Sequence, residues 1–392
     1  MTLSGKTMLQ LDRCFRIPHR LMERLWNSAG HLHCRNQDQF IVIKFMGMGS
    51  LIQFASLCED HGVDKSKITL LSLARHREIC RLIGFEKVWM IRTHNLIFFF
   101  MDCWTALRAA HSLRPTCVID FERCSHAAGL FRILLAWFGQ CSSISFELGR
   151  PVTSPQQIVY PVNELNQEEL FMKGIDQLPK KKQVIQYENI DINPIKIIIN
   201  INASNYLLAR RYPIDSFAIL IKSLHQSNSQ FEFFLTGTPD ESSYVAELIK
   251  KLPGIPAYNV AGKWDLKTFT QGLMTCGLFI SGDSGPLHLA VYLLTPTIAI
   301  WGPTQPGHFG YQSKANLSHL SLNLPCAPCL THPDSHPAKA CLGKIVCMKN
   351  LTATSIVEKS ISILSIQPMS RLVRPPAAMN VLAEMEVKSL LA

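Results

Sequence analysis

The sequence has few charged residues and no long apolar run. Charged side chains make up 17% of the 392 residues and hydrophobic ones 47%. No stretch approaches the roughly 20 apolar residues of a membrane-spanning helix, and the longest run, 96–101, is followed at once by Asp102. The first 40 residues also lack the apolar segment of about 7–15 residues that a secretory signal needs. We therefore expect no spanning helix and a protein that remains in the cytoplasm.

Acidic residues are fewer than basic ones, and the cysteines show no pattern typical of disulfide pairs. There are 29 Asp and Glu against 39 Lys and Arg, which gives a formal net charge of +10. This balance implies an acidic partner: nucleic acid, an anionic membrane face or a phosphorylated substrate. The sequence has no dense basic run and no zinc-finger or RNA-recognition signature, so we expect no nucleic acid. The 13 cysteines are scattered and odd in number, which favours reduced thiols over a disulfide framework.

The length favours two domains with modest tails. Short apolar runs alternate with helical periodicity, which indicates an α/β fold with parallel sheets. Expected strands are 40–44, 68–73, 117–120, 195–201, 231–235, 278–281 and 297–301, and expected helices are 214–224, 241–250, 266–274 and 287–294. The expected parts are a basic N-terminal arm (1–39), an N-terminal domain (40–176), a polar linker (177–194), a C-terminal domain (195–350) and a final helix with its tail (351–392).

The N-terminal arm has two interpretations. Ile17, Leu21, Leu25 and Trp26 recur at near-helical spacing, with arginines mostly on other faces. The helix either docks on the protein core or lies on an anionic lipid surface.

A loop near residue 284 is suited to a phosphate group. A strand ends at Ser281, two glycines permit a tight turn, Asp283 or Ser284 can cap the helix that follows, and Pro286 suits its first turn. Such a turn presents backbone N–H groups and the positive end of a helix dipole to a diphosphate. His288 on the same turn would add a donor. The alternative is an ordinary capped helix on which His288 is merely packed.

These motifs resemble glycosyltransferase family 9, the heptosyltransferases that build lipopolysaccharide. The similarity is carried by 283–290 (DSGPLHLA), 295–306 (TPTIAIWGPTQP), 202–213 (NASNYLLARRYP), 236–240 (TGTPD) and 261–263 (AGK). The resemblance implies a GT-B fold, in which two Rossmann-like domains face each other across a cleft, the N-terminal one on the acceptor side and the C-terminal one on the donor side. It also implies a nucleoside diphosphate sugar donor, ADP-heptose, and no required cofactor.

The resemblance also implies a set of donor-binding residues. Phosphate would be bound by Ser204 and Arg210, with Arg211 a close second, because a guanidinium offers paired donors to phosphate oxygens. The diphosphate and sugar would lie on the second loop. The full donor set is Ser204, Arg210, Arg211, Gly237, Lys263, Asp283, Ser284, Gly285, Leu287 and His288.

The acceptor-side loop departs from the family pattern. The family's first glycine-rich loop ends in Gly-Asp, and that Asp is its proposed general base, whereas this chain has Gly47, Gly49 and then Ser50. A serine hydroxyl cannot serve alone as a base at neutral pH. Glu122, just past a strand end, is the candidate replacement as base or acceptor anchor, with a helix-cap or salt-bridge role as the alternative. A dinucleotide fingerprint is excluded because its third glycine would fall on Ile52.

Four cysteines near the end of the C-terminal domain approach a zinc pattern. Their spacing is Cys326-x2-Cys329-x11-Cys341-x5-Cys347, and the second pair is wider than in a standard zinc ribbon. Plain thiols are the favoured interpretation, and structural zinc the alternative.

Together these features predict an inverting glycosyltransferase. It would move a sugar, heptose by resemblance, from a nucleoside diphosphate sugar to a lipopolysaccharide-type or other lipid-linked saccharide, in peripheral contact with an anionic membrane. The rivals are a catalytically impaired GT-B protein that binds sugar nucleotides or acts as a scaffold, and an epimerase-like GT-B enzyme.

Overall fold

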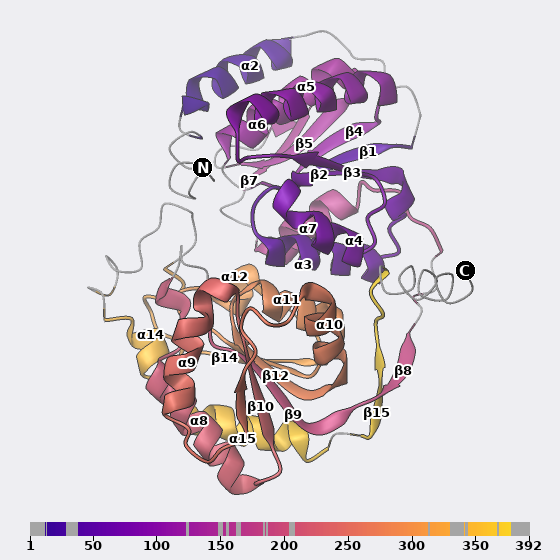
Figure 1. Cartoon of the computed structure of the whole chain (residues 1–392). Coiled ribbons are helices and arrows are strands. Elements are labelled where there is room, and N and C mark those ends of the chain that lie inside the picture. The colour runs from indigo at the N-terminus through magenta and orange to yellow at the C-terminus, as the bar shows by residue number, and fades with distance from the viewer. Residues whose placement is uncertain are drawn as a thin grey trace. The chain divides into compact units, whose positions relative to one another are not determined.

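The computed structural model divides the chain into two compact units, which are treated separately below (Figure 1). It describes residues 12, 14–28, 38–122, 125–147, 152–153, 157–161, 166–182, 185, 187–203, 208–312, 314–329, 341, 344–366 and 368–377. Unit 1 contains the described residues up to 182 and residues 376–377, and unit 2 contains those from 185 to 375. The unit boundary falls inside the range expected for the linker, but residues 188–191 and 193–194 of that range form strands.

Unit 1 is a seven-stranded sheet covered by helices on both faces (Figure 1). The strand order is β3-β2-β1-β4-β5-β7-β6, parallel except for β6. The strands are β1 (Phe40–Ile43), β2 (Ile68–Leu73), β3 (Val88–Ile91), β4 (Cys117–Asp120), β5 (Ser142–Glu147), β6 (Val152–Thr153) and β7 (Gln157–Pro161). The helices are α2 (Arg16–Ser28), α3 (Met48–Asp60), α4 (Arg77–Leu82), α5 (Leu96–Leu113), α6 (His126–Gly139) and α7 (Gln167–Ile175).

Both faces of the unit 1 sheet are packed. On one face α2, α5 and α6 meet the strands through a cluster that includes Trp26, Leu107 and Phe131. On the other, the ring of Phe54 in α3 lies 4.9 Å from that of Phe121 and 5.7 Å from that of Phe171 in α7. A sheet buried on both faces accounts for the nearly continuous apolar runs seen in the sequence.

The N-terminal helix α2 docks on the core of unit 1. Trp26 is 1% exposed, and its ring lies 6.0 Å from that of Trp137 in α6. The apolar stripe predicted from spacing is therefore divided, because Trp26 is buried whereas Ile17, Leu21 and Leu25 are exposed. The prediction that this helix docks on the core is confirmed for the side that carries Trp26, and the side that carries Ile17, Leu21 and Leu25 is exposed.

Unit 2 contains a six-stranded parallel sheet in the order β11-β10-β9-β12-β13-β14. Its strands are β9 (Asn193–Asn200), β10 (Glu232–Thr236), β11 (Ala257–Asn259), β12 (Cys276–Gly282), β13 (Thr297–Ile300) and β14 (Leu317–Leu320). Its helices are α8 (Ile214–Ser227), α9 (Ser242–Lys250), α10 (Leu266–Thr275), α11 (Gly285–Tyr292), α12 (Pro306–Phe309), α14 (Val346–Lys349) and α15 (Ala353–Leu364). β11 and β14 were not predicted, and α11 begins two residues earlier than expected.

A separate two-stranded ladder joins the beginning and end of unit 2. β8 (Glu188–Asp191) pairs antiparallel with β15 (Ser370–Val373), so the chain enters and leaves this unit on adjacent strands. Arg371 fastens the ladder to the main sheet, since its guanidinium donates to the backbone oxygens of Leu273, Met274 and Cys276. Within the described ranges no helix is both long and apolar enough to cross a bilayer.

Candidate functional site

The loops at the carboxyl edge of the unit 2 sheet carry most of the predicted donor-binding residues. Lys263 follows β11, Gly237 follows β10, Arg210 follows β9 and Asp283 follows β12. These four strands are adjacent, so their carboxyl ends form one continuous edge. Ligands of doubly wound α/β sheets bind at such edges.

Arg210 and Asp283 form an ion pair at this edge. Arg210 Nη1 donates to Asp283 Oδ2 at 3.0 Å, and both side chains are largely buried. Burial alone would raise the pKa of the Asp283 carboxyl, but the facing His288 ring and the Arg210 charge outweigh it and hold that pKa well below its usual range. The carboxylate is therefore negative at neutral pH. Arg210 Nε is buried and makes no hydrogen bond to any residue that the structure describes.

His288 is packed among protein groups, which was the alternative interpretation of its position. Its side chain is 4% exposed, its Nδ1 lies 3.1 Å from the Tyr311 hydroxyl, and its Nε2 lies 3.7 Å from Asp283 Oδ1. Both ring nitrogens thus face protein groups, so His288 supports Asp283 instead of reaching a phosphate. Leu287 is likewise fully buried in a small core cluster with Val291 and Trp301, which makes it a packing residue.

No side chain caps the backbone N–H groups at the start of α11. Ser284 occupies the N-cap position, but its hydroxyl meets Asn200 Nδ2 at 3.1 Å and Ser281 Oγ at 3.0 Å and makes no capping bond. The predicted capping by Asp283 or Ser284 is wrong, whereas Pro286 does lie in the first turn. Ser284, Gly285 and Pro286 are partly exposed. The positive end of this helix is consequently open to an anion.

The loops after β9, β10 and β11 lie on the same edge of the sheet as the start of α11. A side chain at Gly237 would place a Cβ 2.6 Å from Asn202 Nδ2, so a larger residue would require Asn202 to shift. Asn202 is buried, and its Oδ1 has no hydrogen-bond partner among the described residues. Lys263 is exposed. Sequence reasoning missed Asn202, although an amide beside a glycine turn at a strand end was a usable signal.

Arg211 is not brought into this group. The Arg211 guanidinium lies 4.3 Å from the Tyr244 ring centre and 3.9 Å from Glu241 Oε1, beside α9. Arg210 is thus the arginine that faces the α11 loop. Ser204 lies outside the described residues.

Unit 1 has a buried ion pair at the corresponding edge of its sheet. Glu122 Oε1 accepts from Lys44 Nζ at 2.7 Å, from Phe45 N at 2.5 Å and from Met46 N at 2.7 Å. Glu122 is 5% exposed and Lys44 5% exposed. Glu122 Oε1 is thus engaged in a salt bridge and two backbone hydrogen bonds, so a proton from a substrate would have to be accepted by Oε2.

The glycine-rich loop beside this pair is shaped by Gly47. Gly47 has φ +76° and precedes α3, while Gly49 is buried inside the first turn of that helix. Ser50 Oγ donates to the carbonyl oxygens of Gly47 and Met46 at 2.9 and 3.1 Å. Ser50 therefore acts as a local turn residue in this structure.

A buried histidine also lies at this edge. His76 Nδ1 is 3.2 Å from Ser72 Oγ, and Ser72 in turn donates to the Lys44 carbonyl. Burial, with the charges of Arg75 and Lys44, lowers the pKa of His76 to about 4. The ring is neutral at pH 7, and its position was not predicted.

The four cysteines of the proposed zinc pattern form no disulfide in the part of the chain that the structure describes. Within the described residues, which leave out 330–340, no three His, Cys, Asp or Glu side chains are arranged to hold a metal. Burial raises the pKa of the Cys347 thiol to about 11. The zinc alternative gains no support from these residues.

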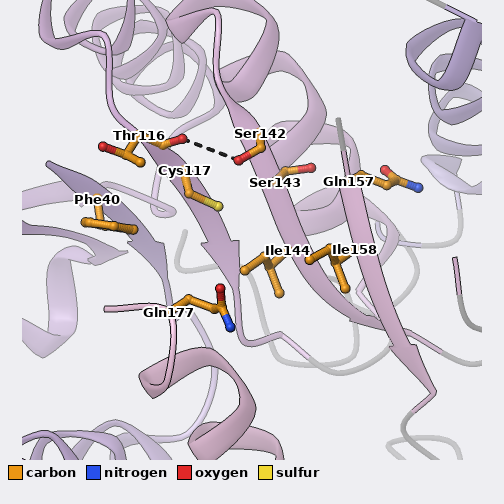
Figure 2. A pocket seen from close by; sticks show the side chains of 9 residues that line it. All are labelled: Phe40, Thr116, Cys117, Ser142, Ser143, Ile144, Gln157, Ile158 and Gln177. Atoms are coloured by element: carbon orange, nitrogen blue, oxygen red, sulfur yellow. Dashed lines mark hydrogen bonds between the residues drawn. The ribbon is translucent and has the colours of Figure 1, made fainter. Parts of the chain in front are cut away.

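A pocket of about 210 Å³ lies elsewhere in unit 1. Figure 2 shows its lining residues, which include Phe40, Cys117, Ser142 and Gln157 at the amino ends of β1, β4, β5 and β7. This edge is opposite to the one that holds Lys44 and Glu122, so the pocket is separate from the predicted site.

Similar solved structures define the class of fold. One is the glycosyltransferase family 9 protein of Veillonella parvula, with TM-score 0.63 at 15% identity over 84% of this chain and 98% of that one. Another is Escherichia coli heptosyltransferase WaaC with ADP, with TM-score 0.58 at 14% identity over 83% of this chain and 99% of that one. The chain therefore has the fold of the GT-B glycosyltransferases.

Sequence comparison finds a similarity to one family. Residues 152–340 match the model of glycosyltransferase family 9 (heptosyltransferase). Lipooligosaccharide heptosyltransferase 2 of Campylobacter jejuni is 29% identical over 171 residues, which are 43% of this chain and 51% of that protein. The match thus spans about half the length of this curated relative. The resemblance of the sequence motifs to family 9 is confirmed.

Proposed function

We propose that this protein is an inverting glycosyltransferase. It transfers a sugar, heptose by resemblance, from a nucleoside diphosphate sugar such as ADP-heptose to a lipopolysaccharide-type or other lipid-linked saccharide. The observation that carries this proposal is the uncapped start of α11 beside Arg210, on an edge where four adjacent loops carry family motifs. The nucleotide found with the WaaC structure supports an ADP donor.

The residues of unit 2 would act on the departing diphosphate. Negative charge grows on its oxygens as the glycosidic bond breaks, and the amides at the start of α11 and the Arg210 guanidinium are positioned to stabilise it. Asp283 fixes the direction of Arg210, and His288 with Tyr311 fixes Asp283. No cofactor or divalent ion enters this scheme.

Binding of ADP by isothermal titration tests the donor site. Arg210→Ala removes the guanidinium and should weaken ADP binding by about tenfold or more, the loss typical of one charge-assisted contact. Arg211→Ala is the matched control and should bind ADP almost as the parent does. Equal affinity of the parent and Arg210→Ala would contradict the donor assignment.

A second candidate is a GT-B protein that binds sugar nucleotides without transferring sugar. It is favoured by the absence of an acid at position 50 and by the three hydrogen bonds on Glu122 Oε1. A transfer assay with a panel of sugar nucleotides separates the two, because only an enzyme releases nucleoside diphosphate in proportion to glycosylated acceptor.

A further inference from the structure

Helix α5 has apolar side chains on its outer face as well as its inner one. Ala106, Leu107 and Ala110 are buried against the sheet of unit 1. The outer stripe, at helical spacing, is Ile97 (68% exposed), Phe100 (61%), Met101 (53%) and Trp104 (55%). The outer stripe of a helix that faces only water is normally polar.

The exposed stripe continues across the neighbouring helices. The ring of Trp104 lies 6.1 Å from that of Phe138 in α6, and Trp137 beside it is 47% exposed. Trp137 in turn contacts Trp26 of α2, whose outer side exposes two leucines. We call this surface the apolar face, and it comprises Phe100, Met101, Trp104, Trp137, Leu21 and Leu25. These helices cover the same face of the unit 1 sheet in Figure 1.

The charges around the apolar face are positive. Asp102 of α5 is held by Arg92 through hydrogen bonds of 2.7 and 2.9 Å, so its charge is compensated. Glu23 of α2 lies 3.9 Å from the buried Arg132. No other acid occurs in α2, α5 or α6. The exposed cations on these helices include Arg16, Arg20 and Arg108.

Helix α5, which carries part of the apolar face, begins at the edge of the sheet where the acceptor loop lies. β3 ends at Ile91 and α5 begins at Leu96, which is 54% exposed. β1 and β4 run parallel to β3 in the same sheet, so Lys44 and Glu122 lie at this carboxyl edge too. A surface that touches lipid here would stand next to the loop expected to meet a lipid-borne acceptor.

We infer that the apolar face docks on the surface of an anionic phospholipid bilayer. The two tryptophans lie at the level of the headgroups, the leucines, Phe100 and Met101 enter the acyl boundary, and the arginines contact lipid phosphates. Docking itself depends only on unit 1. Its use, to present the acceptor loop to a lipid-linked saccharide, rests on the proposed function.

Co-sedimentation of the full chain with vesicles tests docking. The parent should bind phosphatidylglycerol-containing vesicles. The affinity of the double variant Phe100→Ser/Trp104→Ser for these vesicles should be lower by about tenfold or more, because two large exposed side chains no longer enter the membrane. The matched control is Ile219→Ser/Tyr258→Ser, which removes exposed apolar side chains from unit 2. Equal binding by Phe100→Ser/Trp104→Ser and the parent would overturn the inference.

A charge variant tests the choice of lipid. Arg16→Glu/Arg20→Glu should remove the preference for phosphatidylglycerol over phosphatidylcholine vesicles, and a preference that persists would contradict the role of the arginines. Size-exclusion chromatography excludes the other occupant of such a surface: if the parent forms a dimer that Phe100→Ser/Trp104→Ser dissociates, the face is a self-association surface and the inference is wrong.

ADP titration separates this inference from the proposed function. Phe100→Ser/Trp104→Ser should bind ADP with the affinity of the parent, since it lies outside unit 2. If the parent binds vesicles but not ADP, the donor assignment fails and the docking surface stands. If the parent binds ADP but not vesicles, the docking inference fails and the donor assignment stands.

Discussion

Each unit has a buried pair of a cation and a carboxylate at the carboxyl edge of its sheet, and the two pairs differ in what they leave available. In unit 1, Glu122 Oε1 accepts three hydrogen bonds from Lys44 and the loop backbone. In unit 2, Arg210 donates to Asp283 while its Nε has no partner among described residues. The first pair fixes a loop, whereas the guanidinium of the second pair is only partly engaged by the described residues.

The largest effect is expected from breaking the pair in unit 1. Lys44→Met leaves the Glu122 carboxylate buried without its charge partner, which typically lowers the free energy of unfolding by about 3–5 kcal/mol. Thermal and urea unfolding measure the loss. Glu122→Gln, which retains an accepting oxygen for the two amides, is the milder comparison, and equal losses for the two variants would show that the charge is not what matters.

The neutral histidine of unit 1 predicts a pH dependence. The pKa of His76 is lowered from 6.5 to about 4, so the unfolded chain binds more protons than the folded one between these values. Stability is therefore complete above pH 6.5 and falls as the pH drops toward 4, by about 3 kcal/mol. His76→Gln should flatten this slope in urea unfolding measured between pH 4 and 7. An unchanged slope would contradict the burial of a neutral ring.

Breaking the Arg210–Asp283 pair in unit 2 should lower the affinity for ADP more than it lowers the stability of the fold. Asp283→Asn removes the charge that orients Arg210, and ADP affinity should fall by about tenfold. The measurement is titration calorimetry at neutral pH. Asp215→Asn, on the exposed first turn of α8, is the control. A loss of the same size in the control would mean that the effect is general electrostatics.

The smallest predicted effect concerns the missing acid of the acceptor loop. Ser50 only bonds to the turn beside it, so Ser50→Ala should change turnover less than about twofold. Ser50→Asp restores the acid of the family pattern and should raise the rate of sugar transfer by about tenfold, at the low end of general-base effects. A slower Ser50→Asp enzyme would show that proton removal does not occur at this position.

The sequence predicted the donor edge better than the acceptor edge, for a physical reason. The 283–290 loop is a continuous segment whose glycines and proline determine its local backbone, so its position at a helix start could be recognised. Lys44 and Glu122 are 78 positions apart, and only the parallel pairing of β1 with β4 brings them together.

Side-chain direction could not be predicted in either unit. His288 and Leu287 follow the turn at residues 282–285, but the helix rotates both into the interior, toward Tyr311 and Trp301. Apolar spacing in α2 likewise indicated a helix without telling which stripe is buried, since both sides carry large apolar residues. These outcomes depend on contacts with distant elements, which local periodicity does not contain.

The paired strands β8 and β15 make unit 2 an insertion with its two ends together. Because residues 188–191 and 370–373 lie side by side and Arg371 ties them to the sheet, a fragment spanning 185–375 has neighbouring termini and its own core. Such a fragment is suited to autonomous expression, and its ends could be joined by a short linker to build a circular permutant. The fragment would allow the nucleotide binding proposed for unit 2 to be measured in the absence of unit 1.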